Sequence, residues 1–396
     1  MNTLLLLIKR NIKLFFKDKG MFFSALITPA ILLFLYVSFL GNIYRDSFAA
    51  SLPSLPSITD QMMNGLVGAQ LISSLLTVSC VTVAFCTNFL MVQDKANGTI
   101  KDLLMSPVKP SVLSMGYYFA SFLCTMLICI AAMIISFLYL WAVGWYLSLS
   151  DVFSLFLDVG LLVLFGTALS SVIHFFLSTQ GQISAVGTII SAGYGFICGA
   201  YMPISSYGDG LQKALLFLPG TYGTSLLRNH TVRGVLAQMH DAGTPTQVID
   251  TIKASMDCNP IFFGHEVSIP MMYLILSASI LVLIFAYILI NYVSIQKQKW
   301  RVKKKLYFKG NIRKHHDEKI EICRKAAQTD MDLSVPLRTD MSDCFRRLSS
   351  VESKRRGQKR TITGRHTGSR NDCANNCHGK NIDRYSKRNG NEHVNC

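Results

Sequence analysis

Charged residues are missing from five long windows of this chain. Asp, Glu, Lys and Arg are all absent from residues 20–44, 61–93, 110–150, 159–208 and 267–296. A bilayer core about 30 Å thick is crossed by about 20 apolar residues in a helix, so each window is long enough to cross it. The longest window has room for two helices, and a polar, turn-forming run at residues 178–182 divides it. The sequence therefore predicts an all-α integral membrane protein whose domain at residues 20–296 has six transmembrane helices.

Catalytic and metal-binding motifs are missing too. The sequence has no Gly-x-x-x-x-Gly-Lys-(Ser/Thr) segment, so it lacks the loop that cradles nucleotide phosphates. It also has no Ser-His-Asp or His-Glu-x-x-His arrangement, and its cysteines before residue 297 show no paired spacing. Asp158 and His174 are the ionisable residues in or beside the spans, and we expect both to lie at membrane interfaces. We therefore expect neither an enzyme nor a chain that binds its own metal or cofactor.

Positive charge is concentrated outside the windows. The net charge is +16, yet residues 1–296 hold 13 Lys and Arg against 12 Asp and Glu, whereas residues 297–396 hold 26 against 11. Five cations precede the first span and only Arg45 follows it closely, so the positive-inside rule predicts a cytoplasmic N-terminus. Counting spans then places both termini and the loop at residues 93–110 inside, and the loop at residues 203–266 outside. A nucleic-acid partner is not expected, because the membrane domain itself is nearly neutral.

Residues 1–19 have the pattern of an amphipathic helix. Leu4, Ile8 and Phe15 alternate with Lys9 and Lys13 at helical spacing. We predict an interfacial helix whose cations meet anionic headgroups of membrane lipids. Two roles stay open for it: an anchor that only orients the first span, or an elbow that also touches a cytoplasmic partner.

The inner loop at residues 93–110 predicts a helix of about two turns. Asn97-Gly98 is typical of a turn, Thr99 is a candidate cap, and Ser106-Pro107 would end the helix. The helix would show Ile100, Leu103 and Leu104 on one side. Such a helix would either dock another protein or fold back onto the membrane surface.

In the fifth predicted span, Gly195-x-x-x-Gly199 predicts close packing within the subunit or against a second copy.

Two groups of motifs resemble those of ABC type 2 transporter permeases. The first, after the second span, is Asp94, Gly98-Thr99, Leu103-Leu104 and Ser106-Pro107-Val108. The second, after the fifth span, is Met202-Pro203-Ile204-Ser205, Leu218-Pro219-Gly220-Thr221-Tyr222 and Leu227-Arg228. The resemblance covers roughly residues 1–300. The chain departs from the family at Asp94-Lys95-Ala96-Asn97, which carries fewer charges than is common there.

The resemblance implies a permease subunit of an ATP-driven exporter, in the plasma (inner) membrane of a bacterium. It would pair with a second permease subunit, identical or related, and with cytoplasmic ATP-binding-cassette ATPases that hold the ATP and Mg²⁺. Coupling to the ATPase would fall to Asp94, Gly98, Thr99, Leu103, Leu104 and Pro107. Residues 211–218 would form a re-entrant or outer gate helix, with Pro203, Pro219 and Tyr222 as gate residues; a plain loop helix over the span ends is the alternative.

The basic tail, residues 297–396, has little to build a core from. Within residues 310–396, Leu, Ile, Val and Phe number 12 of 87, below the roughly 20% of folding chains, so disorder is expected. Binding of anionic lipid, binding of nucleic acid and an extension without function are all compatible with this composition. The alternative to the exporter is a non-transporting membrane anchor or sensor whose tail recruits a partner.

Overall fold

The computed structural model describes residues 2–51, 58–106, 108–294 and Glu321. The chain divides into two units, residues 1–302 and 303–396, and every element discussed below belongs to the first. The predicted disorder of the tail falls on residues outside the described part. The first half of this unit consists of helices. They are α1 Asn2–Lys17, α2 Lys19–Leu35, a π-helical turn Tyr36–Leu40, α3 Gly41–Ser51, α4 Asp60–Ala96 and α5 Thr99–Met105.

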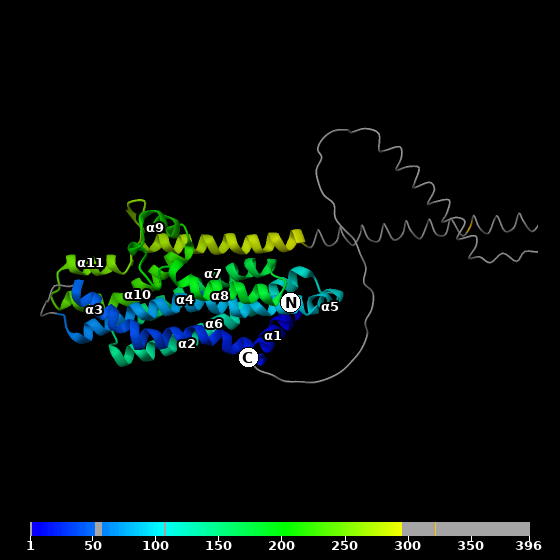
Figure 1. Ribbon diagram of the computed structural model, residues 1–396, viewed down its shortest axis with the longest axis horizontal. Coiled ribbons are helices and arrows are strands. Elements are labelled where there is room, and N and C mark those ends of the chain that lie inside the picture. Colours follow the sequence, from blue (N-terminus) through cyan, green and yellow to red (C-terminus); the bar gives the residue numbers. More distant parts are fainter. Residues whose placement is uncertain (1, 52–57, 107, 295–320, 322–396) are drawn as a thin grey trace, which may run out of the picture. The chain divides into compact units, whose positions relative to one another are not determined.

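The second half of this unit continues the helical pattern (Figure 1). It contains α6 Pro110–Val143, α7 Leu149–Phe176, α8 Gln180–Ile197, a 3₁₀ turn Ile204–Ser206, α9 Asp209–Leu216, α10 Pro219–Asp241 and α11 Thr246–Ser255. A short antiparallel hairpin follows, with β1 Ile261–Phe262 and β2 His265–Glu266. The last described helix, which we call the last helix, is Ile269–Ser294.

Five helices of the described part are long and apolar enough to cross a membrane. They are Lys19–Asp46, Asp60–Ala96, Pro110–Val143, Leu149–Phe176 and Ile269–Ser294. Five of the six predicted spans are therefore present as such helices. The predicted fifth span corresponds to α8, which has only 18 residues and begins with the polar run Gln180-Gly181-Gln182. Because of its polar residues, α8 is not apolar enough to count among the five membrane-capable helices.

Helix α4 is the central element of the bundle. In its most apolar window 94% of the residues are buried, against 17% in the last helix. Serine and threonine side chains on α4 donate to backbone carbonyls of the preceding turn, as Thr77 Oγ1 does to Ser73 O at 2.8 Å. Small residues bring neighbouring helices close: a Cβ on Gly166 of α7 would lie 3.0 Å from Cys80 O. Helices α6, α7, α8 and α10 surround α4 (Figure 1).

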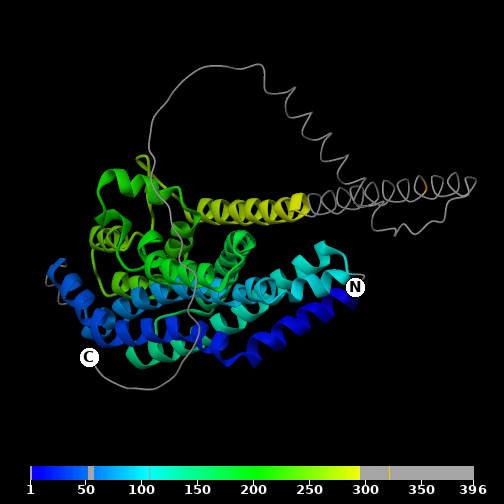
Figure 2. The same ribbon diagram turned by 45° about the vertical axis from the view of Figure 1, so that its right-hand side comes forward.

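The bundle has two distinct ends. The start of α1 and helix α5 lie at one end, and α3 and α11 lie at the other, in both ribbon views (Figure 1, Figure 2). We call these the α5 end and the α11 end. At several turns that join successive helices, polar side chains cap the next helix, because the first amides of a helix need acceptors. Capping boxes at Ser148/Asp151 and Thr179/Gln182 begin α7 and α8.

Helix α1 packs on the bundle with part of the predicted apolar face, which includes Phe15. Leu7, Asn11 and Phe15 are buried, and Leu7 Cβ would lie 3.0 Å from a Cβ placed on Gly116 of α6. Leu5, which the amphipathic pattern allows in the apolar face, is 58% exposed. The buried stripe follows the i, i+4, i+8 spacing of one helix face. This stripe of α1 therefore packs on the bundle, mainly on α6, while Leu5, Leu6 and Phe16 are exposed.

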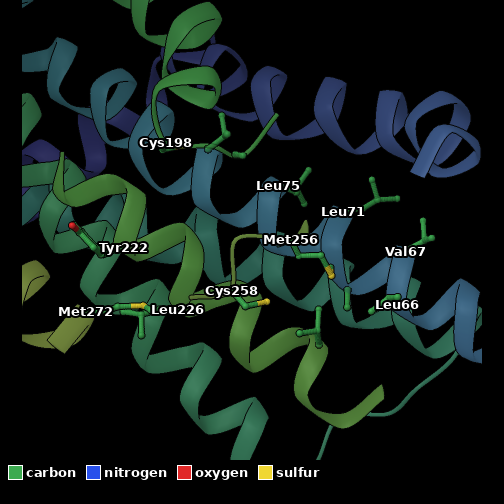
Figure 3. Close-up of a cluster of buried hydrophobic side chains, with 14 of the residues drawn as sticks. Leu66, Val67, Leu71, Leu75, Cys198, Tyr222, Leu226, Met256, Cys258 and Met272 are labelled. Carbon is green, nitrogen blue, oxygen red and sulfur yellow. The ribbon is translucent and has the colours of Figure 1, made fainter. Parts of the chain in front are cut away.

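The predicted outer loop is largely a buried helical layer. Residues 211–218, predicted as a short helix, lie mostly in α9, and Pro219 occupies the first turn of the 23-residue helix α10. Side chains of α10 such as Tyr222 and Leu226 enter the main apolar cluster with Leu66 and Leu71 of α4 (Figure 3). Met256 and Cys258, which follow α11, join the same cluster.

Candidate functional site

Asp94 joins three helices at the α5 end. Its Oδ2 accepts hydrogen bonds from Arg10 Nη1 of α1 at 2.9 Å and from Tyr117 Oη of α6 at 2.6 Å. Burial lowers the pKa of Arg10, but the hydrogen bond and charge of Asp94 outweigh this effect and raise it overall. Asp94 is 7% exposed, so its carboxylate points into the subunit. Asp94 therefore positions α1 against α4 and α6, and its role in coupling to an ATPase stays a prediction.

Helix α5 forms in the inner loop as predicted, although Thr99 does not cap it. Gly98 is the N-cap, with φ +82°, and Thr99 is the first helical residue. A left-handed conformation favours glycine, so the turn before α5 depends on Gly98. Ile100 and Leu103 pack against the apolar cluster that contains Leu7 and Phe15 of α1. One face of α5 therefore folds back onto its own subunit.

The opposite side of α5 is open. Asp102 is exposed, and Met105 is 90% exposed at the end of the helix. Of the predicted coupling residues, Asp94 is buried and Gly98, Thr99 and Leu103 are half-buried, whereas the exposed Asp102 and Met105 are not among them. Pro107 lies outside the described residues, and so does the side chain of Leu104.

A row of donors on α10 forms what we call the carbonyl clasp. Its four residues are Thr224, Ser225, Arg228 and Asn229. Thr224 Oγ1 donates to Cys198 O at 2.8 Å, Ser225 Oγ to Asp257 O at 2.8 Å and Asn229 Nδ2 to Cys258 O at 2.5 Å. Arg228 donates to Met256 O at 2.8 Å and to Gly199 O at 2.5 Å. The clasp therefore fastens α10 to the ends of two other helices.

Arg228 is the charged member of the clasp and is 1% exposed. Its acceptors are the C-cap residue of α11, Met256, and the residue after the C-cap of α8, Gly199. Helix C-termini carry partial negative charge and unpaired carbonyls, so they compensate a buried cation. The sequence motif Leu227-Arg228 pointed to this residue, but only the fold brings the two helix ends around it.

The predicted gate residues all belong to the layer that the clasp holds. Pro203 precedes the 3₁₀ turn, whose Ile204 and Ser205 amides donate to the carboxylate of Asp257. Pro219 begins α10, and Tyr222 Oη donates to Leu216 O at 2.7 Å across the α9–α10 turn. The layer is therefore closed by hydrogen bonds on both sides of α10.

The two predicted packing glycines serve a turn instead of a helix face. Helix α8 ends at Ile197, so Gly199 lies in the following turn with φ +75°. A Cβ on Gly195 would collide with the ring of Tyr201, and one on Gly199 would lie 2.8 Å from Ile204 Cγ1. These glycines let the chain after α8 fold back closely, because a side chain at either position has no room. The expected continuous Gly195–Gly199 helix face is not formed.

Asp158 lies inside the bundle and not at an interface. Its carboxylate is 1% exposed and accepts from Tyr273 Oη of the last helix at 2.6 Å. His230 Nδ1 of α10 lies 2.6 Å from the other carboxylate oxygen. Sequence reasoning found no base facing Asp158, because these partners are 72 and 115 positions away. An intramembrane carboxylate of this kind is buried only when it is paired.

His174 is also buried within the protein and lies in the last turn of α7. It is 0% exposed, its Nδ1 lies 2.7 Å from Ser170 O, and its ring lies 5.4 Å from the rings of Phe85 and Phe89. In the described part of the chain, no cluster of three His, Cys, Asp or Glu side chains is suited to a metal ion. The arrangement as a whole is one of structural contacts between helices.

The comparisons with known proteins match this architecture. Residues 2–230 match the family ABC-2 type transporter, a range that runs from α1 into α10 and covers more than half of the chain. Comparison with curated proteins finds no significant match. The matched range contains Asp94, α5 and the clasp, and the five membrane-capable helices make the protein a multi-pass membrane protein. A domain of this family is a permease and is not itself catalytic. The chain therefore belongs to the ABC-2 type transporter family, as a transporter permease.

Proposed function

We propose that this permease is the membrane subunit of an ATP-driven exporter in the plasma (inner) membrane of a bacterium. A separate cytoplasmic ATP-binding-cassette ATPase holds the ATP and Mg²⁺, and this chain binds no cofactor. The observation that carries the proposal is the joined surface of α1 and α5 at one end of the bundle. The Arg10–Asp94–Tyr117 contacts tie α1 to the helix end from which α5 begins.

The exposed parts of this surface suit a protein partner. Lys9, Lys13 and Lys17 are exposed on one side of α1, and Asp102 and Met105 are exposed on α5. Partner sites combine an apolar anchor with surrounding charges, and Met105 supplies such an anchor. Gly98 and Thr99 set where α5 begins, and Leu103 packs α5 against its own subunit. Asp94 fixes α1 to the bundle. Leu104 and Pro107 stay predicted contacts.

A sixth crossing completes the proposed topology. Helix α8 has 18 residues, a length of about 27 Å at 1.5 Å per residue, close to the thickness of a bilayer core. Most of its exposed residues up to residue 192 are small or polar, among them Gly181, Ser184, Ala185, Thr188 and Ala192, with Ile189 as a large apolar exception. Phe196 and Ile197 are exposed at its end. The exposed side of α2 instead carries Phe23, Ile27 and Phe34, as a lipid-facing surface does. We assign the α8 face to the path between this chain and a second permease subunit, identical or related.

The direction of transport follows from the proposed orientation. The positive-inside rule puts the α5 end in the cytoplasm and the α11 end outside, with both termini cytoplasmic. ATP-driven closure of the ATPases would move α1 and α5 and open the path toward the α11 end. Pro203, Pro219 and Tyr222 lie in the layer that would then act as the outer gate.

Co-purification from the native cell in mild detergent tests the proposal. Mass spectrometry should identify a stoichiometric ATP-binding-cassette subunit, and the complex should hydrolyse ATP. Met105→Asp should reduce recovery of the ATPase, because it places a charge on the exposed anchor. Ile261→Asp, a similar change at a 53% exposed position of β1, should leave recovery unchanged. Recovery of this chain without any ATPase would instead favour the anchor or sensor, in which deletion of residues 310–396 abolishes function.

A further inference from the structure

The last turn of α4 makes contacts in two directions. Asp94 bonds to α1 and α6, as described above. The neighbouring Lys95 reaches the C-terminal end of α7, where its Nζ donates to Phe175 O at 2.7 Å, His174 O at 3.2 Å and Leu177 O at 3.5 Å. The same Nζ lies 4.9 Å from the centroid of the Phe175 ring. A cation at the unpaired carbonyls of a helix C-terminus is stabilised by charge-assisted hydrogen bonds and by the helix dipole.

Lys95 stands between two short connections. On one side, only Asn97 and Gly98 separate the end of α4 from the start of α5. On the other side, Leu177 is the C-cap of α7, and Thr179 is already the N-cap of α8. The Thr179/Gln182 capping box fixes how α8 begins. A displacement of α5 is therefore passed through few rotatable bonds to Lys95, and from the carbonyls that it holds to the first turn of α8.

We propose that Lys95 is a positioning residue that transmits movement of α5 to the α7–α8 turn, and hence to the α8 face of the transport path. This inference rests on the proposed docking of an ATPase at α1 and α5. Asp94 keeps α1 and α4 together, whereas Lys95 links α4 to the start of α8. A lysine that only stabilised the end of α7 would have no effect on how α8 responds to nucleotide.

Hydrogen exchange of the full chain in complex with its co-purified ATPase tests this inference. Deuterium uptake is compared by mass spectrometry with and without ATP and vanadate, in peptides that cover residues 97–106 and 177–185. Lys95→Met keeps the aliphatic stem and removes the donors, whereas Lys95→Arg keeps a charged donor. Lys109→Met is the matched control, since Lys109 is exposed in the same loop.

The wild-type complex should show a nucleotide-dependent change in both peptides. In Lys95→Met the change at residues 177–185 should fall below half of the wild-type value, while the change at residues 97–106 stays. Lys95→Arg and Lys109→Met should keep both changes. An unaltered response of residues 177–185 in Lys95→Met overturns the inference and leaves the proposed function standing. Loss of both responses also overturns it, because Lys95 would then act on docking. Failure to recover an ATPase with the wild-type chain overturns the proposed function, and the inference falls with it.

Discussion

The arginine at each end of the bundle is held by different chemistry, although Lys95 at the α5 end also bonds to backbone carbonyls. At the α5 end, the arginine forms an ion pair with another side chain. Arg10, whose side chain is 28% exposed, bonds to Asp94 at 2.9 Å. At the α11 end, the fully buried Arg228 and its neighbours on α10 bond to backbone carbonyls. A partly exposed ion pair contributes little to stability and breaks readily, whereas a buried cation among carbonyls leaves several groups unpaired when it is lost.

This difference fits what each end has to do. A surface that receives movement from a partner benefits from contacts that exchange with water at low cost. A gate layer that must stay shut without nucleotide benefits from contacts that are costly to lose. We therefore expect contacts at the α11 end to contribute more to stability than those at the α5 end, where we propose coupling to an ATPase.

The largest expected effect is that of Arg228→Met. The substitution leaves Gly199 O and Met256 O without their donors, and we expect a loss of stability on the order of 3 kcal/mol. The thermal unfolding midpoint in detergent measures it. The matched control is Arg233→Met on the same helix, because the Arg233 side chain is 65% exposed and lies 3.6 Å from Asp151. Its loss should cost at most about 1 kcal/mol.

Arg228→Lys sharpens the first experiment. Lysine keeps the charge but lacks the planar fork that bonds to two carbonyls at once, so its unfolding midpoint should fall between those of wild type and Arg228→Met. Equal midpoints for Arg228→Met and Arg233→Met would contradict the contrast drawn between the two ends.

The next effect concerns the attachment of the last helix. Tyr273→Phe removes the hydroxyl that donates to Asp158 at 2.6 Å, and we expect a cost of about 1 to 2 kcal/mol. Phe keeps the ring, so packing is preserved. A double-mutant cycle with Asp158→Asn measures the coupling, and additive effects would show that the hydroxyl and the carboxylate act separately.

The sequence predicted the membrane helices better than the site. Missing charges identify an apolar helix wherever it lies, and so each of the five membrane-capable helices overlaps a charge-free window, although Leu149–Phe176 also contains Asp151 and Asp158. The prediction failed for α10, which carries Arg228, His230 and Arg233 and has no apolar face of its own. Its polar side chains are buried because carbonyls near residues 198 and 256 receive their hydrogen bonds. No local pattern shows such distant acceptors.

The same limit applies to the inner motif. The order of Asp94, Gly98 and Leu103 pointed to the right loop, and the turn and helix lengths followed from Gly98 and Ser106. The sequence did not show that the Asp94 side chain points into the subunit. Its partner Arg10 is 84 positions away and could not be distinguished from the other basic residues of α1. The motifs located the inner loop, and tertiary contacts decided which of its side chains are exposed.

A smaller effect on stability is expected at the α5 end. Arg10→Met should lower the free energy of unfolding by about 1 kcal/mol or less, because the guanidinium is partly hydrated. The effect on recovery of the ATPase should be larger, since α1 loses its attachment to α4. The charge-swapped pair Arg10→Asp with Asp94→Arg should restore part of the recovery. Lys13→Met, an exposed cation on the same helix, is the control for loss of charge alone.

The smallest expected effect on stability comes from ionisation of the Cys258 thiol at high pH. The reactivity of this thiol is also the most local test of the clasp. Burial raises the pKa of its thiol to about 12, above the ordinary value of 9.0. The unfolded chain therefore loses this proton first, so the contribution of Cys258 to stability is complete below pH 9 and is lost as pH rises toward 12. Alkylation by iodoacetamide at pH 8, followed by peptide mass spectrometry, should leave Cys258 unmodified in the folded protein and modify it in denaturant. Arg228→Met should make Cys258 reactive without denaturant, whereas Arg233→Met should not; protection of Cys258 in both variants would show that the layer stays closed without the clasp.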